Sequence, residues 1–198
     1  MRGTPIGKFS VEEYFRMDAD SQPPLEYHDG EVFQIDGADY WHGLVCSALC
    51  VSLGNRLEGT PCNVAVAPRV RTTRTNDVHP DLVVVSGKPV FTGECQDTIA
   101  NPKLVIEILS PATADYDFSR KLELYRGLPS IDEYILAAQD RARIDTFRRL
   151  SDGNWRLSAV SDLEATLRLE SLNIAVPLAE IYRGVELRPA DSLPPRCN

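Results

Sequence analysis

The sequence predicts an α/β fold in which a mixed central β-sheet is flanked by α-helices. Two continuous β-branched runs, at 80–85 and 103–109, are typical of central strands that are buried on both faces. A stripe of apolar residues with helical spacing covers 39–57, so a long helix is expected there. Since strands and helices follow one another along the chain, the pattern indicates the α/β class.

The length of the chain fits a single domain. With 198 residues one compact core can form, and we expect one domain over 1–198. Its ordered core is expected over about 8–188, followed by a polar tail at 189–198. Hydrophobic residues make up 43% of the chain and charged residues 25%, which is ordinary for a soluble globular protein.

The N-terminal part carries two local signals. Ser10 has capping-box spacing with the glutamate three residues later, so a short helix is expected over about 10–18. Asp29-Gly30 suits the two positive-φ positions of a type I′ turn. The runs at 25–28 and 31–35 on either side therefore predict a β-hairpin.

The remaining elements follow from hydrophobic periodicity. The segment 63–73 is expected to be one extended strand, bent at Pro68, because Val70 alternates with Arg69 and Arg71. Later elements are expected as a helix at 117–127, strands at 133–138, 143–149 and 155–160, and a short helix at 178–182.

The formal net charge of −8 limits the partners. It argues against a general polyanion binder, because long-range steering of DNA or RNA would be unfavourable. A nucleic-acid enzyme with this charge should bind weakly and depend on metal. Local phosphate contacts stay open, and strand alternation also explains the candidate arginines without nucleic acid. These are Arg69, Arg71, Arg74, Arg141, Arg143, Arg148 and Arg149.

The cysteines and the first residues of the chain indicate the cellular compartment in which the protein is expected. Five cysteines are an odd number, and no CxxC pair occurs among them. This indicates reduced thiols and predicts a cytoplasmic protein. The first residues lack an apolar signal core, and no stretch approaches transmembrane length, so no membrane partner is expected.

One acid stands inside an apolar run. Glu107 lies within 104–109, where a buried carboxylate is costly unless a cation, a metal or hydrogen bonds compensate it. Asp81 opens a second apolar run, at 82–85. Mg²⁺ takes oxygen ligands, usually one or two carboxylates. Asp81 and Glu107 could supply them if their strands are neighbours, and the backbone carbonyl of Ile108 could supply a third oxygen.

Competing interpretations exist for the polar residues near these acids. Lys121, on the following helix, would bring a cation to a substrate phosphate or orient a water molecule. Glu107 and Lys121 could instead form a structural ion pair, and Lys121 could be a solvated surface residue. Glu31 could add a further acid to the metal site or be an exposed hairpin residue. His42 could be a local hydrogen-bonding residue at a helix start.

Other chemistries lack their motifs. The chain has no GxSxG elbow, no GxxxxGK[ST] phosphate loop and no GxGxxG dinucleotide turn. Three histidines without HExxH or paired cysteines argue against a zinc site.

The residues around the two acids resemble a known family. Pro80-Asp81, the Glu-Ile-Leu-Ser-Pro stretch within 102–111 and the Lys-Leu-Glu-Leu-Tyr stretch within 120–125 are similar to motifs of the Uma-two endonuclease family. The resemblance covers most of the chain, because it extends to 25–31, His42, 131–136 and 178–182.

The Uma-two family belongs to the PD-(D/E)XK, or restriction-endonuclease-like, superfamily. The resemblance therefore implies a restriction-endonuclease-like fold, Mg²⁺ or Mn²⁺ as cofactor, and hydrolysis of DNA phosphodiester bonds. Asp81 matches the motif aspartate, Glu107 matches the motif glutamate, and the family places a histidine at His42. Many folds of this type work as dimers, so a homodimer is expected.

The lysine departs from the superfamily pattern. The superfamily places it two residues after the glutamate, where this chain has Leu109. The family supplies a lysine from the next helix, which matches Lys121. A rival interpretation follows, in which the chain keeps the nuclease fold as a catalytically weak or inactive nucleic-acid-binding or regulatory module.

Overall fold

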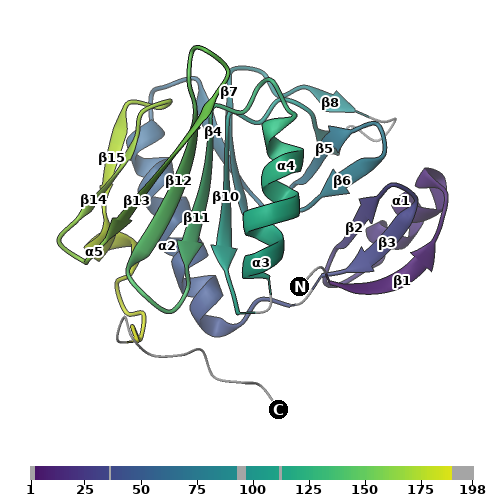
Figure 1. Cartoon of the computed structure of the whole chain (residues 1–198), viewed down its shortest axis with the longest axis horizontal. Coiled ribbons are helices and arrows are strands. Elements are labelled where there is room, and N and C mark those ends of the chain that lie inside the picture. The colour runs from purple at the N-terminus through teal and green to yellow at the C-terminus, as the bar shows by residue number, and fades with distance from the viewer. Residues whose placement is uncertain (1–2, 36, 93–96, 112, 189–198) are drawn as a thin grey trace.

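The described residues form two large β-sheets with helices packed around them (Figure 1). The computed structural model describes residues 3–35, 37–92, 97–111 and 113–188. The predicted tail at 189–198 lies outside these residues. A separate two-stranded ribbon, β14 (Thr166–Leu169) with β15 (Ile174–Pro177), closes one end of the molecule.

A six-stranded mixed sheet forms the centre, in the order β13-β12-β11-β10-β7-β4. β10 and β11 run parallel, and the other neighbours are antiparallel. The prediction of a mixed sheet flanked by helices is therefore confirmed. The strands are β4 (Cys62–Val66), β7 (Leu82–Ser86), β10 (Leu104–Leu109), β11 (Glu133–Ala138), β12 (Arg143–Arg149) and β13 (Trp155–Ser161).

A second sheet of seven short strands was not anticipated from the sequence. Its order is β1-β3-β2-β6-β5-β9-β8, and it carries the predicted hairpin at one end (Figure 1). Asp29 and Gly30 have φ values of 50° and 91°, as the type I′ turn requires. The strands are β1 (Thr4–Lys8), β2 (Leu25–His28), β3 (Glu31–Gln34), β5 (Arg69–Thr73), β6 (Asn76–Val78), β8 (Phe91–Thr92) and β9 (Thr98–Ile99).

The segment 63–73 is two strands rather than the single strand expected. β4 belongs to the six-stranded sheet and β5 to the seven-stranded sheet. Ala67 between them has a φ of 47°, so the chain turns sharply before Pro68 and passes from one sheet to the other. Alanine rarely adopts this conformation, which explains why the sequence did not signal the break.

The helices occur where they were predicted, with one irregularity. They are α1 (Val11–Ala19), α2 (Tyr40–Leu57), α3 (Ala114–Tyr116), η1 (Asp117–Lys121), α4 (Leu122–Arg126) and α5 (Leu178–Ile181). Ser10 and Glu13 form the capping box that starts α1. The helical segment predicted at 117–127 begins earlier, with α3, and the first turn of the predicted range, η1, is a turn of π-helix. Such turns are rare and often occur at functional sites.

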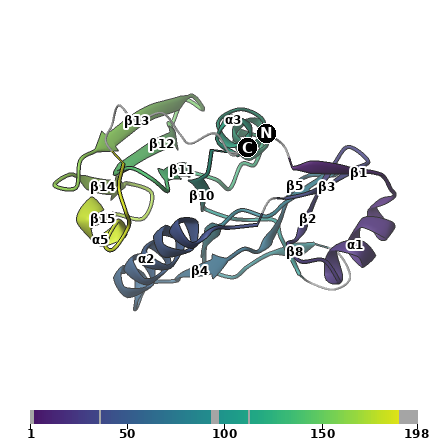
Figure 2. The ribbon, with the colours of Figure 1, turned by 90° about the horizontal axis from the view of Figure 1, so that it is seen from below.

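The six-stranded sheet is covered on both faces. α2 packs on one face, where Leu49 belongs to the same core cluster as Leu104 and Ile106. α4 packs on the other face, where Tyr125 belongs to the same core cluster as Val105. Seen from below, α2 and α3 lie on opposite sides of β10 (Figure 2). Because side chains alternate along β10, the odd-numbered residues face α4.

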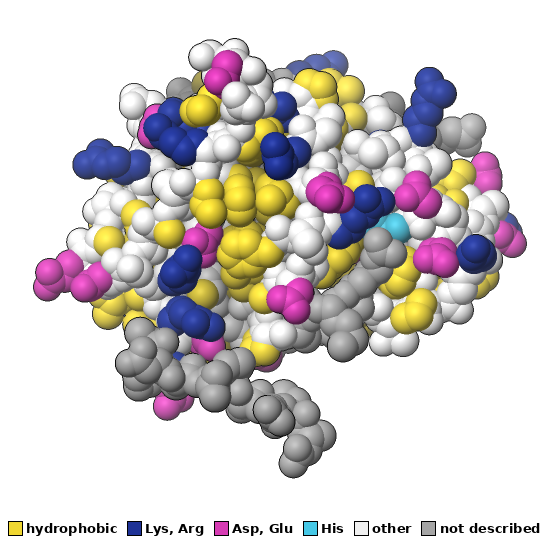
Figure 3. Space-filling model, in the orientation of Figure 1, with side chains coloured by type: hydrophobic (Ala, Val, Ile, Leu, Met, Phe, Trp, Pro, Cys, Tyr) yellow, Lys and Arg dark blue, Asp and Glu magenta, His cyan; other side chains and the backbone are white. Residues whose placement is uncertain are grey.

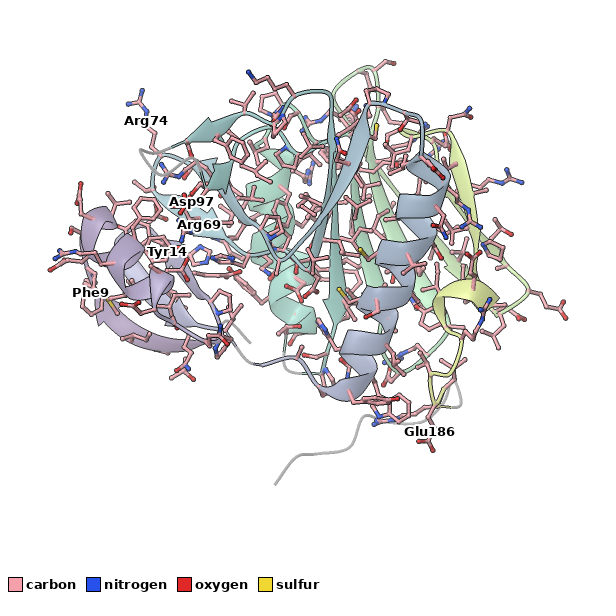
Figure 4. All side chains as sticks on the ribbon, turned by 180° about the vertical axis from the view of Figure 1, so that it is seen from behind. Phe9, Tyr14, Arg69, Arg74, Asp97 and Glu186 are labelled. Carbon is pink, nitrogen blue, oxygen red and sulfur yellow. The ribbon has the colours of Figure 1, made fainter. Side chains whose placement is uncertain are left out.

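Ion pairs tie the N-terminal elements to the rest of the chain. Arg69 at the start of β5 donates to Asp18 of α1 at 3.0 Å and to Asp97 at 2.9 Å. Arg69 and Asp97 lie together beside the N-terminal elements, whereas Arg74 projects outward (Figure 4). Arg69 is buried, so it is a structural residue and does not face solvent as a phosphate contact would.

Apolar side chains gather on the face that carries β11 and β12 (Figure 3). Phe118 and Leu157 are exposed there, and the rings of Phe118 and Phe147 are 6.3 Å apart. None of the described helices is both long and apolar enough to cross a membrane.

Candidate active site

Two neighbouring strands bring Asp81 and Glu107 together. Ile106 of β10 is paired with Leu82 of β7, so the next step of the antiparallel register places Glu107 opposite Asp81. Both acids lie on the face of the sheet toward α4, with Val83 and Val105 in the same layer. The sequence-based expectation that the two strands are neighbours is therefore met.

Asp81 is held by both of its carboxylate oxygens. Oδ2 accepts a hydrogen bond from the backbone N–H of Ile108 at 2.7 Å. Oδ1 lies 3.2 Å from Nε2 of His42, in the first turn of α2. Burial opposes the charged form of His42, but the hydrogen bond and the charge of Asp81 raise its pKa overall. His42 is therefore a partner of Asp81 at the sheet end, and Asp39 caps the helix that carries it.

Glu107 meets two side chains from the helical segment that covers it. Lys121 Nζ lies 2.9 Å from Oε1, and the Tyr125 hydroxyl donates to the same oxygen at 2.7 Å. Lys121 ends the π-helical turn, and Tyr125 follows one turn later on α4. Lys121 therefore points inward to Glu107, and the interpretation as a solvated surface lysine is wrong.

A third acid, Glu26 of β2, reaches Lys121 from the other sheet. Its Oε1 lies 3.2 Å from Lys121 Nζ, and Asp117 Oδ1 lies 3.6 Å from the same nitrogen. In the sequence, Glu26 stands out only as part of the stretch 25–31 that resembles the family, and Asp117 only as the start of the predicted helix. Glu26 looks like an ordinary polar position in a short hairpin strand, so its role depends on contacts distant in sequence that local patterns do not reveal.

Asp81, Glu107 and Asp117 line a cleft of about 530 Å³, whereas Glu26 contacts Lys121 without being part of the lining. Apolar and glycine residues from several loops form much of its wall. The polar part of the lining includes His42, Asp81, Glu107, Tyr116, Asp117 and Lys121. A volume of this size accommodates a small-molecule-sized portion of a substrate.

Burial divides the acids into two classes. Burial raises the pKa of Glu107 well above its usual range, against the effect of Lys121, with Asp117 and Asp81 contributing. Burial likewise raises the pKa of Asp117 to about 6. Burial also opposes ionisation of Glu26, but Lys121 and hydrogen bonding to His28 outweigh it and lower the pKa.

Glu31 is not brought into the cleft. It starts β3, is half-buried and is paired with His28 and Lys8 at the turn end of the hairpin. It is absent from the described residues that line the cleft. The acid that the hairpin contributes is Glu26, because its position in β2 faces Lys121 and lies away from the turn.

The donors fit a hard divalent cation held by few protein ligands. Among the described residues, no three His, Cys, Asp or Glu side chains are grouped so that they could hold a metal ion on their own. Mg²⁺ needs only one or two carboxylates, with water and substrate oxygens completing the octahedron. Asp81 and Glu107 could provide these. The Ile108 carbonyl could add a third oxygen, since the N–H and C=O of a strand residue point to the same side.

The charge balance of the cleft supports the same conclusion. Lys121 is one ammonium group among three buried carboxylates, those of Glu26, Glu107 and Asp117. Oδ1 of Asp117 accepts no hydrogen bond from any described residue. Burial disfavours the ionised forms of Glu107 and Asp117, and a cation bound beside them would favour these forms.

Comparison with known proteins places this arrangement in a family. The sequence pattern of the Uma2 family, described as "putative restriction endonuclease", matches residues 11–179. The chain belongs to the Uma2 family. Two Synechocystis sp. (strain ATCC 27184 / PCC 6803 / Kazusa) proteins, both named as uncharacterized, are similar over most of their length. Protein slr1290 is 29% identical over 184 residues, 91% of this chain and 95% of the relative. Protein sll1609 is 26% identical over 167 residues, 83% and 94% of the two chains.

A solved structure shares the fold of this Uma2 chain. The crystal structure of "a putative nuclease belonging to DUF820" from Anabaena variabilis ATCC 29413 superposes with a TM-score of 0.70 at 16% identity. The match covers 88% of this chain and 97% of the other. The predicted restriction-endonuclease-like fold class and the predicted family are both confirmed.

Proposed function

We propose that this Uma2 protein is a divalent-metal-dependent endonuclease that hydrolyses DNA phosphodiester bonds. The observation that carries the proposal is the meeting of Asp81, Glu107 and Lys121 in one cleft, although the lysine comes from a helix and not from the strand of Glu107. The family description and the nuclease fold of the solved relative support the same reaction class. The description as a restriction endonuclease favours DNA as the substrate.

Asp81, Glu107 and the backbone carbonyl of Ile108 would hold the ion, Mg²⁺ or Mn²⁺. When bound, such an ion lowers the pKa of a coordinated water and neutralises charge that develops on the phosphate. His42 and the Ile108 amide hold the Asp81 carboxylate in place, and in the proposed site they would orient it as a ligand. Orientation of a ligand by a neighbouring hydrogen bond commonly decides the affinity of a metal site.

Lys121 would place a fixed positive charge beside the reacting phosphate. Although burial opposes its charged form, Glu107, Glu26 and Asp117 raise its pKa well above the usual value, so it stays an ammonium group. Preorganised charge of this kind stabilises an oxyanion without reorganisation during the reaction. Lys121 would therefore take the role of the superfamily's strand lysine, whose position is occupied by Leu109 in this chain.

The direct test is cleavage of supercoiled plasmid and of circular single-stranded DNA, with Mg²⁺, with Mn²⁺ or with EDTA. We expect cutting only with metal, and a loss of about 100-fold or more in Asp81→Ala and in Lys121→Ala. Glu133→Gln is the matched control, because Glu133 is a buried acid of the same sheet that bonds to Ser171 far from the cleft. It should cut like the wild-type protein.

The rival function is a binding or regulatory module that does not cut. Leu109 in the superfamily lysine position and the net charge of −8 favour it. Binding of DNA or metal by wild-type protein without any cleavage would establish the module and contradict the enzyme. Self-association stays a prediction, which light scattering of the purified protein measures directly.

A further inference from the structure

Glu26 is bonded through both of its carboxylate oxygens. Oε1 contacts Lys121 Nζ at 3.2 Å and accepts from the backbone N–H of His79 at 3.4 Å. Oε2 accepts from the Tyr116 hydroxyl at 2.9 Å and lies 3.1 Å from Nε2 of His28. Glu26 is 1% exposed, so no solvent replaces these partners. The hairpin thus contacts Lys121, a residue of the cleft lining, through one buried side chain.

The ring of His28 is itself held by Asn76, on the side away from Glu26. The amide nitrogen of Asn76 donates to Thr73 Oγ1 at 2.7 Å and to Asp29 Oδ1 at 3.2 Å, so its amide oxygen faces the ring. Nδ1 of His28 lies 3.2 Å from that oxygen and is therefore the donor. This leaves Nε2 directed at Glu26 and at the Tyr116 hydroxyl, 2.8 Å away. Tyr116 and His28 therefore both lie against Oε2 of Glu26, and Oε1 contacts Lys121.

Two acids compete for the same ammonium group. Glu107 and Glu26 lie 2.9 Å and 3.2 Å from Lys121 Nζ. In the proposed enzyme the Glu107 carboxylate binds the metal ion and is less available to Lys121. Lys121 then needs another carboxylate, because an ammonium group buried without a counter-ion is strongly disfavoured. Of the two acids, Glu107 lines the cleft, whereas Glu26 lies behind Lys121 and has partners at both of its oxygens. Glu26 is thus the carboxylate placed to stay beside Lys121.

Glu26 also touches the chain that leads to the metal-binding strand. The His79 N–H that it accepts belongs to the residue two positions before Asp81. Nε2 of His79 lies 3.2 Å from Asp18 of α1, which anchors the same stretch from the N-terminal side. The N-terminal elements therefore contact both the lysine and the approach to the first acid.

We propose that Glu26 is a positioning residue, which holds the Lys121 ammonium at the cleft and leaves Glu107 available for the metal ion. This rests on the proposed nuclease function. It assigns the N-terminal hairpin to the active site, with His28 and Tyr116 as the residues that orient Glu26. The reacting groups themselves remain those of the six-stranded sheet and the π-helical turn.

A double-mutant cycle tests whether Glu26 acts through Lys121. The four proteins are wild type, Glu26→Gln, Lys121→Gln and the double variant, with kcat and KM measured on plasmid under Mn²⁺. We expect Glu26→Gln to lower kcat about 10- to 100-fold with KM nearly unchanged, as for other residues that orient a catalytic group. In the Lys121→Gln background the same change should cost less than about 3-fold, because its target is gone.

The same four proteins give a readout that needs no activity. The urea midpoint, measured in EDTA, should fall in each single variant by more than in the double variant. Lys121→Gln leaves Glu26 buried without its cation, and Glu26→Gln removes one of the carboxylates that stabilise the buried Lys121 ammonium. Equal, additive effects of Glu26→Gln in both backgrounds, on rate or on midpoint, would overturn the proposal.

Two further outcomes can be told apart from failure of the Glu26 proposal. Should wild type show no metal-dependent cutting, the nuclease function fails, while the urea midpoints still decide whether Glu26 and Lys121 are coupled. Should Lys121→Gln not fold, the comparison of Glu26→Gln with the buried-acid control Glu133→Gln decides: a kcat loss confined to Glu26→Gln supports the proposal, and an equal loss in both overturns it.

Discussion

Asp117 is the acid of the cleft with the weakest compensation. Its side chain is 2% exposed, and Oδ1 accepts no hydrogen bond from the described residues. The nearest cation, Lys121, is 3.6 Å away and is shared with two other acids. Burial is the main reason that its pKa rises to about 6. The ionised form of Asp117 is therefore disfavoured in the folded protein.

Replacement of Asp117 by Asn should stabilise the protein at neutral pH. The folded-state pKa lies above the ordinary value of 3.8, so between about pH 4 and pH 6 the folded chain keeps a proton that the unfolded chain has released. The free energy of unfolding consequently falls as pH rises through this window. At pH 7.5, Asp117→Asn should gain up to about 3 kcal/mol relative to wild type.

Urea denaturation at pH 4.5 and pH 7.5, both in EDTA, measures this difference. At pH 7.5 the urea midpoint of the variant should be clearly higher than that of wild type, and at pH 4.5 the difference should be much smaller. A variant less stable than wild type at pH 7.5 would show instead that the Asp117–Lys121 ion pair stabilises the fold.

The residues of the site differ in how far the sequence could reveal them. Asp81 and Glu107 were found because a charged residue beside or within an apolar run is a local anomaly, and strand pairing then brought them together. Lys121 needed the family resemblance, since its helix looks like a solvated one. Glu26 could not be found locally, because its ion pair joins two sheets across the chain. Glu31, the hairpin acid that was chosen, lies at the wrong end of the strand pair.

At the scale of elements, two glycines should respond in opposite directions to the same substitution. Gly30, in the hairpin turn, has a φ of 91°, which an L side chain rarely adopts. Gly54 lies inside α2, where an added Cβ would meet nothing within 4 Å. Gly30→Ala should cost about 1 to 2 kcal/mol of unfolding free energy through backbone strain. Gly54→Ala should add about 0.5 to 1 kcal/mol, because alanine favours a helix interior.

Urea midpoints of the two variants against wild type measure both effects. A stabilising Gly30→Ala would contradict the positive-φ turn, and with it the hairpin geometry that directs Glu26 toward the cleft. A destabilising Gly54→Ala would mean that this exposed face of α2 contacts another surface.

The elements that sequence predicted well are those with a strong periodic or capping signal. The stripe of α2, the capping box of α1 and the Asp29-Gly30 turn each depend on neighbours in sequence, and each is confirmed. The break at Ala67 was missed because no glycine marks its positive φ. The π-helical turn was missed because Phe118, Leu122 and Tyr125 also fit the i, i+4, i+7 spacing of a regular α-helix.

At the scale of the whole molecule, the cleft is where its separate layers meet. The six-stranded sheet supplies Asp81 and Glu107, the seven-stranded sheet supplies Glu26, α2 supplies His42, and the π-helical turn supplies Lys121. Since no single element contains the site, unfolding of any layer separates its groups. A ligand of the cleft is for this reason linked to the stability of the whole chain.

Divalent metal should accordingly raise the melting temperature. At a free concentration ten times the dissociation constant, binding to the folded state alone adds about 1.4 kcal/mol, or about 3 to 6 °C for a chain of this size. We expect this shift when Mg²⁺ or Mn²⁺ replaces EDTA at pH 8, with NaCl adjusted to equal ionic strength. Glu107→Gln should abolish the shift, since it removes a proposed ligand from β10, while Glu133→Gln, which alters a buried acid of the adjacent strand β11, should retain it. A shift of the same size in Glu107→Gln would mean that the ion binds elsewhere on this acidic chain, and the excess of buried carboxylates would then need another explanation.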